Sequence, residues 1–325
     1  MKAIDFTDCM IGYRFYDGAD KKISVEYNGK FYLLKFAKSI EKRNELNTSY
    51  ANNVFSEYIG SHIFADCGIE SQNTLIGTYK GKLVVACEDF NREGFHLQEF
   101  SKFENSYLGT GNAERTPRLE DVENIIRNHE RLDIRDEAEE RFWDTFVLDA
   151  FLGNFDRHCG NWGYLVNEDT HAMKLAPVYD CGGCLYPQLA DHSLEHIMNH
   201  PEEMEKRIYQ FPKAALQIGG QRVGYNEVIN SMEYPGCNRA LVKIVPQIEM
   251  DRIRNIINET PLISEVRKRF LMTMLQKRKE CLLDKPFEKL QVKGQDSVIK
   301  KLQENKEKAG RRQTVKSRIQ ESERS

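Results

Sequence analysis

Three polar residues near the middle of the sequence have the types and the order needed to transfer a phosphoryl group. Asp156 and Asn161 form a D-x-x-x-x-N pattern in GNFDRHCGNW, and Asp180 follows in APVYDCGGC. Such a transfer needs a carboxylate that orients and deprotonates the attacking hydroxyl, together with metal ions that bridge the phosphates. Magnesium takes few protein ligands, all through oxygen. We therefore predict Asp156 as the catalytic base and Asn161 and Asp180 as ligands of Mg²⁺.

The elements around these residues are predicted to bring them together. The stretch RDEAEERFWDTFVLDAFLGN is typical of an amphipathic helix that becomes more apolar toward its end. After it, WGYLVN and MKLAPVYD are typical of two short strands joined by the polar turn EDTHA. A hairpin of these strands folds the chain back, so Asp180 at its far end can lie beside Asp156 and Asn161.

An ion pair upstream could supply the cation that phosphoryl transfer also needs. Lys35 stands near the end of the predicted strand FYLLKFA, and Glu57 follows in a helix predicted near residues 50–66. Glu57 lies among apolar positions of that helix, where a carboxylate without a cation is costly. A pair between Lys35 and Glu57 would satisfy the carboxylate and direct the lysine at the phosphates of ATP.

The other predicted ATP contacts follow from the order of the elements. The turn GADKK lies between the first two predicted strands, where a kinase places its nucleotide-covering loop, and we expect Gly18 and Lys22 to contact the phosphates. The segment CEDF joins the last of these strands to the helical part, and we expect Glu88 and Phe90 to meet the adenine. The same residues would also make an ordinary turn and linker with no ligand.

The order of elements predicts two parts. Strands are predicted at residues 9–16, 23–27, 31–37, 74–79 and 82–88, with Asn28-Gly29 as a hairpin turn. From about residue 91 the pattern is helical apart from the hairpin described above. Further helices are predicted at residues 117–132, 193–207, 224–232, 238–258, 262–283 and 295–308.

In this order, the motifs resemble those of the HipA-like serine/threonine kinases, and within that family the bacterial cell-translocating kinases. The resemblance rests on GADKK, on LLKF with Lys35, on SEY with Glu57, on DRHCGN and on APVYD. It implies an α+β, two-lobed protein-kinase-like fold: an N-lobe at residues 1–88, with a small antiparallel sheet and one helix, and a larger, mainly helical C-lobe at residues 89–285. It also implies ATP and Mg²⁺ as cofactors, and protein serine or threonine, including the kinase itself, as substrate.

Neighbouring reactive groups are assigned supporting roles. Arg157 and His158 are predicted to hold the loop rather than to take part in the chemistry. Cys181 and Cys184 form a C-x-x-C, but no second such pair or nearby Cys/His pair completes a zinc site. We interpret CGGC as a flexible glycine segment, with a redox-sensitive segment as the alternative.

Composition limits the remaining classes. The net charge is −3, which gives no general attraction to nucleic acid or anionic membrane, and no apolar run is long enough to span a membrane. Residues 286–325 are basic, with 11 Lys and Arg against 6 Asp and Glu, and we expect a partly disordered tail. The sequence shows no pattern of a secretory signal, and its cysteines are scattered, so we expect a cytoplasmic protein. The family resemblance implies export without a signal peptide and action in a host cell.

Two other functions stay open at this point. D-R-H-x-x-N also occurs in phosphoinositide kinases. A lipid kinase would need a basic, membrane-facing loop after Asp180, but the segment after Asp180 in this chain is rather acidic. A kinase-shaped module without activity would act through its surface and basic tail. A metal-dependent nuclease is disfavoured because the body of the chain is net negative.

Overall fold

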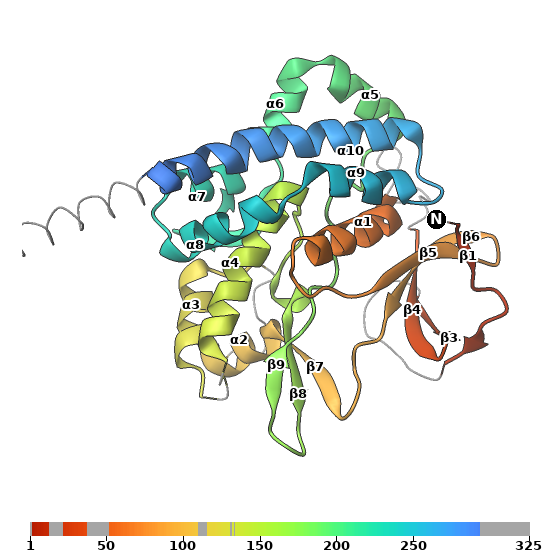
Figure 1. The fold of residues 1–325 in the computed structure, drawn as a ribbon. Coiled ribbons are helices and arrows are strands. Elements are labelled where there is room, and N and C mark those ends of the chain that lie inside the picture. The colour runs from red at the N-terminus through yellow and green to blue at the C-terminus, as the bar shows by residue number, and fades with distance from the viewer. Residues whose placement is uncertain are drawn as a thin grey trace, which may run out of the picture.

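The computed structural model describes residues 2–12, 22–37, 52–109, 116–130, 132 and 134–292. Gly18, part of the predicted first strand and the predicted helix at residues 295–308 lie outside these described residues. Within them, a sheet on one side and a larger body of helices on the other meet at helix α1, Asn53–Asp66 (Figure 1). No helix in these ranges is both long and apolar enough to cross a membrane.

The smaller lobe is a six-stranded sheet in the order β1-β5-β6-β4-β3-β2. Its strands are β1 Ile4–Asp5, β2 Met10–Ile11, β3 Lys22–Tyr27, β4 Lys30–Phe36, β5 Thr74–Tyr79 and β6 Lys82–Glu88. All neighbours pair antiparallel except β1 and β5, which form a short parallel pair that was not predicted.

The turn between β3 and β4 sets their register. Asn28 and Gly29 both have positive φ, 51° and 72°, as a two-residue hairpin turn of the I′ type requires. The hairpin pairs Tyr27 with Lys30 and continues to Lys22 opposite Lys35. The predicted Asn-Gly hairpin is therefore present, and it places two lysines side by side at its open end.

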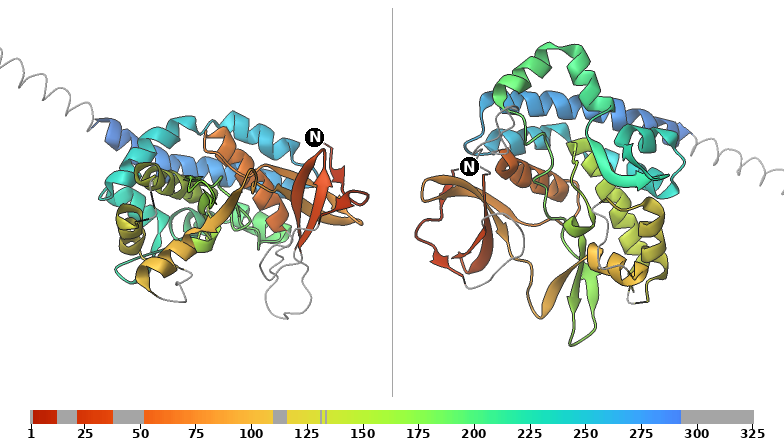
Figure 2. Two further views of the ribbon diagram at one scale, coloured as in Figure 1. Left: turned by 90° about the horizontal axis from the view of Figure 1, so that it is seen from below. Right: turned by 180° about the vertical axis from the view of Figure 1, so that it is seen from behind.

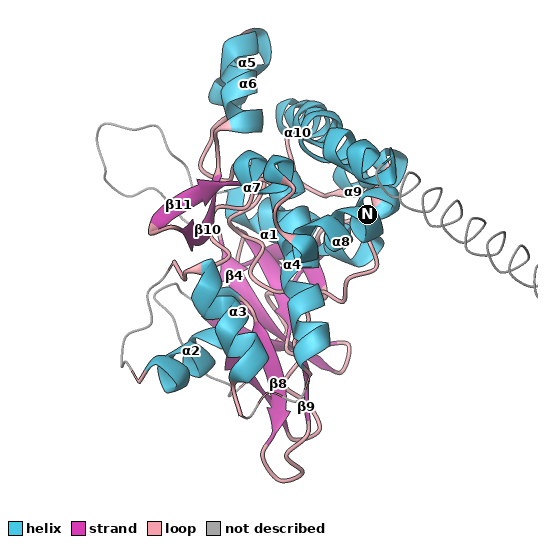
Figure 3. Ribbon diagram, turned by 90° about the vertical axis from the view of Figure 1, so that its left-hand side faces the viewer, coloured by secondary structure: helices cyan, strands magenta, loops and turns pink. Residues whose placement is uncertain are grey.

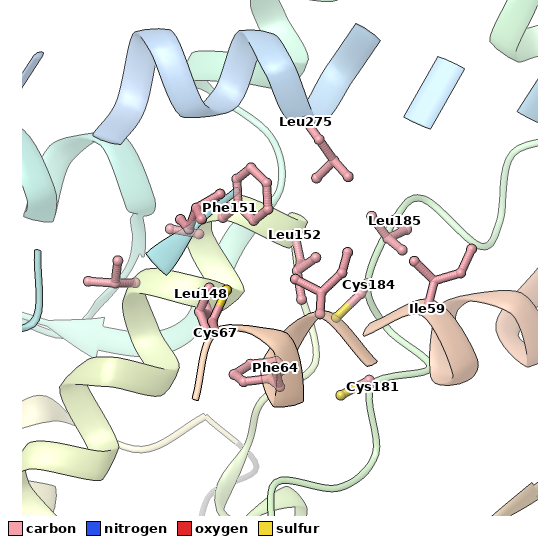
Figure 4. Packing of buried hydrophobic residues seen from close by; sticks show 14 of the residues in the cluster. Ile59, Phe64, Cys67, Leu148, Phe151, Leu152, Cys181, Cys184, Leu185 and Leu275 are labelled. Atoms are coloured by element: carbon pink, nitrogen blue, oxygen red, sulfur yellow. The ribbon is translucent and has the colours of Figure 1, made fainter. Parts of the chain in front are cut away.

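Helix α1 belongs to the core of both lobes. Val54, Ile59 and Ile63 are fully buried, and α1 packs on β5 and β6 on one side and on α9, Met250–Glu259, on the other. Its apolar residues join one continuous cluster with Leu152 and with residues of the C-terminal helices (Figure 4). A polar side chain on α1 is thus held in a fixed place between the lobes.

The larger lobe is mainly helical but contains two small sheets. Its elements are β7 Phe95–Glu99, α2 Phe100–Leu108, α3 Leu119–Asn128, α4 Arg135–Leu152, β8 Gly163–Asn167, β9 Met173–Leu175, α5 Asp191–Asn199, α6 Pro201–Tyr209, β10 Lys213–Ile218, β11 Gln221–Gly224, α7 Tyr225–Ser231, α8 Pro235–Ile244, α9 and α10 Glu265–Arg278. In the right view of Figure 2, α10, in blue, passes below the green helix pair α5 and α6, which it contacts, and it also packs on α9. It ends in a π-helical turn, Lys279–Asp284.

Proline divides two of the predicted helices. The predicted helix at residues 193–207 is two helices, because Pro201 starts α6 as its first residue. The predicted helix at residues 238–258 is α8 and α9, with Pro246 in a short 3-10 turn between them, since proline removes a helical hydrogen bond.

Strands in the larger lobe were partly mispredicted. The strand predicted over residues 173–180 ends at Leu175, and Asp180 lies in the loop beyond it. β7 and the hairpin of β10 and β11 were not predicted. β7 pairs with β8 to make a three-stranded sheet, and β10 and β11 stand apart beside α7 (Figure 3).

Candidate active site

The loop that carries Asp156 begins where α4 ends. Gly153 takes the left-handed conformation that commonly closes a helix, with φ of 66°. The next residue, Asn154, is fully buried; its Nδ2 donates to Asp149 Oδ1 at 2.8 Å, and its Oδ1 accepts from the Asp156 N–H at 3.0 Å. This bracing turns the chain so that the Asp156 side chain is exposed, as a base that meets a substrate hydroxyl must be.

Arg157 joins this loop to the segment that ends in Asp180. Its Nε donates to Asp149 Oδ2 at 2.9 Å, and its Nη1 donates to the carbonyl oxygens of Asn161, at 3.0 Å, and of Tyr179. Burial alone would lower the pKa of Arg157, but the carboxylate of Asp149 outweighs it and the pKa is raised. The guanidinium stays charged and holds both segments, which agrees with the predicted supporting role.

His158 also acts on the loop itself. Its Nδ1 accepts from the Gly160 N–H at 3.1 Å and so begins the 3-10 turn Cys159–Asn161. That turn brings Asn161 back over Asp156, whose carbonyl oxygen accepts from Asn161 Nδ2 at 2.6 Å. The predicted support by His158 is therefore a capping interaction.

Asn161 and Asp180 present oxygen atoms suited to a magnesium ion. Because Nδ2 of Asn161 is the donor to Asp156, its Oδ1 is the atom available to a metal. Asp180 has a positive φ of 55° and a side chain 42% exposed. Within the described ranges, no three His, Cys, Asp or Glu side chains gather that could hold a metal alone. An Asn–Asp pair fits Mg²⁺, which takes its other ligands from water and phosphate.

Lys35, Glu57 and Asp180 form a charged triad between the lobes. Lys35 Nζ lies 3.2 Å from Glu57 Oε1 and 3.2 Å from Asp180 Oδ1. The predicted pair of Lys35 and Glu57 is present in the structure, and the contact of Lys35 with Asp180 brings the predicted metal ligand to the same point. Strand β4, helix α1 and the loop after β9 each contribute one member.

The triad members have shifted pKa values. Burial would lower the pKa of Lys35, but Asp180 and Glu57 raise it well above its usual value. Lys35 holds the pKa of Asp180 below its usual range, so that carboxylate is ionised at neutral pH. Burial raises the pKa of Glu57 in spite of the nearby lysine, because Glu57 is only 2% exposed.

Lys22 lies on the same face of the sheet as Lys35. The register of β3 and β4 places the two residues directly opposite each other, and opposite residues project to one face of a sheet. Two lysines at one position suit the phosphates of a nucleotide. Gly18, predicted beside Lys22, lies outside the described residues.

Glu88, at the start of the linker between the lobes, bonds to residues of both flanking segments. The backbone N–H of Glu88 donates to the Asn73 carbonyl at 2.8 Å, and its carbonyl accepts from Gln72 Nε2 at 2.9 Å. Its side chain pairs with Lys30 at 3.0 Å and with Arg92. These bonds hold both the backbone and the side chain of Glu88, and its contact with adenine stays a prediction.

Phe90 keeps its predicted place in the linker. Its ring lies 5.7 Å from that of Tyr179, measured between centroids, so it closes the gap between the linker and the Asp180 loop. The N–H of the preceding Asp89 donates to the Phe31 carbonyl at 2.8 Å. The N–H of Phe90 has no acceptor within the described residues, and its contact with adenine stays a prediction.

The CGGC segment is a buried turn. Cys184 N–H donates to the Cys181 carbonyl at 3.0 Å, and both side chains are fully buried as free thiols (Figure 4). A Cβ at Gly183 would lie 2.8 Å from Cβ of Asp156, and one at Gly182 would lie 3.1 Å from Glu57 Oε2. Glycine is needed here for close approach rather than for the predicted flexibility.

Two residues that position the site, Asp149 and Arg278, were not predicted from the sequence. Asp149 pairs with Arg157 and is 1% exposed, although it stands in the apolar run VLDAFL. A carboxylate in an apolar run is the same signal that identified Glu57. Arg278 carried no comparable signal, because its partners are distant backbone groups.

Arg278 supports the site from behind. Its side chain is 1% exposed, and its Nε donates to the carbonyls of Ala150 at 2.9 Å and Phe151 at 3.2 Å. Its Nη1 reaches Tyr186 Oη and the Phe211 carbonyl, both at 3.3 Å. The positive charge thus caps the negative C-terminal end of α4, directly before the loop with Asp156.

The comparisons with known proteins agree with this geometry. The HipA-like C-terminal domain family matches residues 16–237, which include every element of the site. The chain belongs to the HipA-like kinases. The protein named serine/threonine-protein kinase CtkA, from Helicobacter pylori strain J99, is 38% identical over 287 residues, 87% of each chain.

Solved structures confirm the predicted fold of this HipA-like kinase. The crystal structure described as a Helicobacter pylori proinflammatory kinase CtkA matches with a TM-score of 0.83 and 37% identity, over 89% of this chain and 98% of that one. HipA from Shewanella oneidensis MR-1, in a complex with HipB and operator DNA, matches with a TM-score of 0.50 and 17% identity, over 85% of this chain and 68% of that one, and bears on the fold alone. The predictions of an α+β kinase-like fold and of the serine/threonine protein kinase class are confirmed.

Proposed function

We propose that this kinase transfers the γ-phosphoryl group of ATP, with Mg²⁺, to serine and threonine hydroxyls of proteins, itself included. The hydroxyl oxygen forms a bond to Pγ, the bond from Pγ to the β–γ bridging oxygen breaks, and ADP leaves. Asp156 orients the hydroxyl and accepts its proton. Lys35, held by Glu57, neutralises charge on the α- and β-phosphates.

The remaining groups bind and position. Asn161 and Asp180 would hold Mg²⁺, which neutralises charge on the phosphates when bound. Phe90 would donate from its backbone to adenine, and Lys22 would add a second cation on the phosphate face. The observation that carries the proposal is the meeting of Lys35 with both Glu57 and Asp180 at 3.2 Å, beside a loop that exposes Asp156.

Mass spectrometry of the purified chain incubated with ATP and Mg²⁺ tests this function. We expect added phosphate on serine or threonine of the wild type and of a generic protein acceptor, and almost none with Asp156→Asn or Asp180→Asn. Both variants should fold, since Asp156 is exposed, and Asp180→Asn keeps the size of the side chain and the backbone contact with Arg157. Full transfer by either folded variant would contradict the assignment.

A parallel assay separates a protein kinase from a lipid kinase. Labelled ATP is supplied with either a serine-containing protein or phosphoinositide vesicles, and label in protein alone is expected. A thermal shift with ATP and Mg²⁺ that Asp180→Asn reduces argues against a non-catalytic module.

We extend the proposal to action on a host cell because the relative with the matching crystal structure is described as proinflammatory. Added to cultured host cells, the wild-type protein should enter and phosphorylate host proteins, whereas Asp156→Asn should enter without doing so. Exclusion of both proteins from the cells would contradict this extension and leave the kinase activity itself untouched.

A further inference from the structure

A groove of about 450 Å³ lies next to the loop with Asp156, on the side of β10 and β11. We call it the β10 groove. Its walls come from the loop after α4, the continuation of the Asp180 segment, the end of α6, the start of β10, and β11. Residues that line it include Phe155, Tyr186, Leu189, Phe211, Lys213 and Arg222.

The groove opens beside the catalytic base. Arg222 Nη2 donates to the carbonyl oxygen of Phe155, the residue before Asp156. The Asp180 segment, which lines the groove through Tyr186, also passes close to the base, because a Cβ at Gly183 would lie 2.8 Å from Cβ of Asp156. A polypeptide whose hydroxyl reaches Asp156 would therefore place its neighbouring residues in the β10 groove.

Part of the groove is apolar and open to solvent. Phe211 is 54% exposed, an unusual state for a large aromatic side chain. Pro212, Leu189 and the buried Tyr186 line the same groove. Such a surface suits a large apolar side chain of a bound peptide.

The rim of the groove is cationic. Lys213 and Arg222 are exposed, and neither has a carboxylate partner among the described residues. The Arg222 guanidinium is nevertheless held in place, because its Nε donates to the Ala214 carbonyl at 2.6 Å and its Nη2 to the Lys213 carbonyl at 3.3 Å. Arg207, the third cation, pairs with Glu203. No described carboxylate lines the groove.

We propose that the β10 groove binds the part of a protein substrate next to the acceptor hydroxyl, and that it selects a large apolar side chain together with an acidic residue. This inference rests on the proposed function. The chain's own C-terminal segment is a poor occupant of the groove, because residues 286–325 carry 11 Lys and Arg against 6 Asp and Glu and would be repelled by the cationic rim. An acidic partner is the one that complements Lys213 and Arg222.

Peptide binding without ATP tests the groove independently of catalysis. The probes are fluorescein-labelled nonapeptides with a central serine in an alanine and glycine background. A leucine and a neighbouring glutamate are moved together through the four positions on each side. Each probe has one partner with glutamine and another with lysine in place of the glutamate. Fluorescence anisotropy gives the Kd for the wild type, Lys213→Glu and the matched control Lys277→Glu, which changes an exposed lysine on α10.

We expect the best glutamate peptide to bind the wild type and Lys277→Glu about tenfold more tightly than its glutamine partner, a free-energy gap typical of a close charge pair. Lys213→Glu should lose this preference and prefer the lysine peptide. Circular dichroism and thermal melting confirm that both variants fold. A wild type that binds all three peptides equally, or a Lys213→Glu variant that keeps the preference for glutamate, would overturn the proposal.

The apolar part has its own pair of variants. Phe211→Ser should reduce the preference for leucine over serine in the peptide, whereas Leu262→Ser, also exposed but located between α9 and α10, should keep it. Equal behaviour of the two variants would overturn the assignment of Phe211. The same peptides with ATP and Mg²⁺ then separate the two hypotheses. Phosphoryl transfer to all the peptides alike would refute selection by the β10 groove but not the kinase function. Selective peptide binding with no phosphoryl transfer would refute the kinase function but not the groove.

Discussion

Replacing Glu57 with glutamine tests the triad most directly. At 3.2 Å, the attraction between Glu57 Oε1 and Lys35 Nζ is about 5 kcal/mol at an effective dielectric constant of about 20. Burial opposes this attraction and raises the pKa of Glu57. A carboxyl whose folded pKa is raised adds stability below its unfolded pKa, about 4.3, and loses that contribution as the pH rises through the folded value. Ionising Glu57 therefore costs free energy in the folded protein.

Glutamine removes both the attraction and this cost, while Lys35 keeps Asp180 at 3.2 Å. Removing one partner of an isolated buried pair costs about 3–5 kcal/mol, because it leaves a buried charge alone. Here a second carboxylate remains and Lys35 is 22% exposed. We expect Glu57→Gln to leave the free energy of unfolding within about 1 kcal/mol of the wild type at pH 7. The wild type should lose stability relative to this variant as the pH rises above about 4.3.

Activity should change much more than stability. Without Glu57, Lys35 is held by Asp180 alone and is no longer directed at the phosphates, and a misplacement of about 1 Å can cost about 10²-fold in rate. Urea unfolding at several pH values and steady-state kinetics with ATP measure the two effects, with the exposed Glu233→Gln as control. A stability loss of about 3–5 kcal/mol, a wild-type advantage that grows with pH, or kcat/KM within twofold of wild type would refute this account of the triad.

Two further variants test the supports of the site. Arg278→Met should lower the free energy of unfolding by about 3 kcal/mol or more, because it leaves several buried carbonyls without donors, two of them at the end of α4. Urea unfolding measures this loss. A loss below about 1 kcal/mol would show that water replaces the guanidinium. The doubly substituted Cys181→Ser, Cys184→Ser protein should respond to hydrogen peroxide as the wild type does, since burial raises the pKa of the Cys184 thiol well above its usual value and so keeps it unreactive. Oxidant that inactivates only the wild type would restore the redox alternative.

The positions of site residues could be predicted from the sequence where a local sequence pattern determines their surroundings. A carboxylate at position 57 within an apolar helix requires a cation, and Lys35 on the preceding strand is the cation within reach. Asp180 could be placed near Asn161 because a short hairpin must return the chain. In each case a period or a turn in a few residues determines the geometry.

Other features depend on bonds between distant segments and could not be predicted this way. The backbone of Glu88 is bound by Gln72 and Asn73, and nothing in CEDF indicates it. Arg278 reaches α4 across more than a hundred residues of sequence. The missed hairpin of β10 and β11 is different, because Gly219-Gly220, both with positive φ, is a recognisable turn signal between two short alternating runs.

Under the proposed function, charge within the triad would let one arrangement serve both before and after ATP binds. One lysine and two carboxylates leave a net charge of −1 at a point between the lobes, and Asp180 is the more exposed carboxylate, with 42% of its side chain open against 3% for Glu57. A divalent cation at Asp180 would change this net charge from −1 to +1. Lys35 would then be released from Asp180 toward the phosphates, while Glu57 would continue to hold Lys35. The buried carboxylate is thus the fixed member and the exposed one is the exchangeable member. Arg157, which holds the backbone of Asp180 through the neighbouring Tyr179 carbonyl, keeps the exchangeable carboxylate in place during this change.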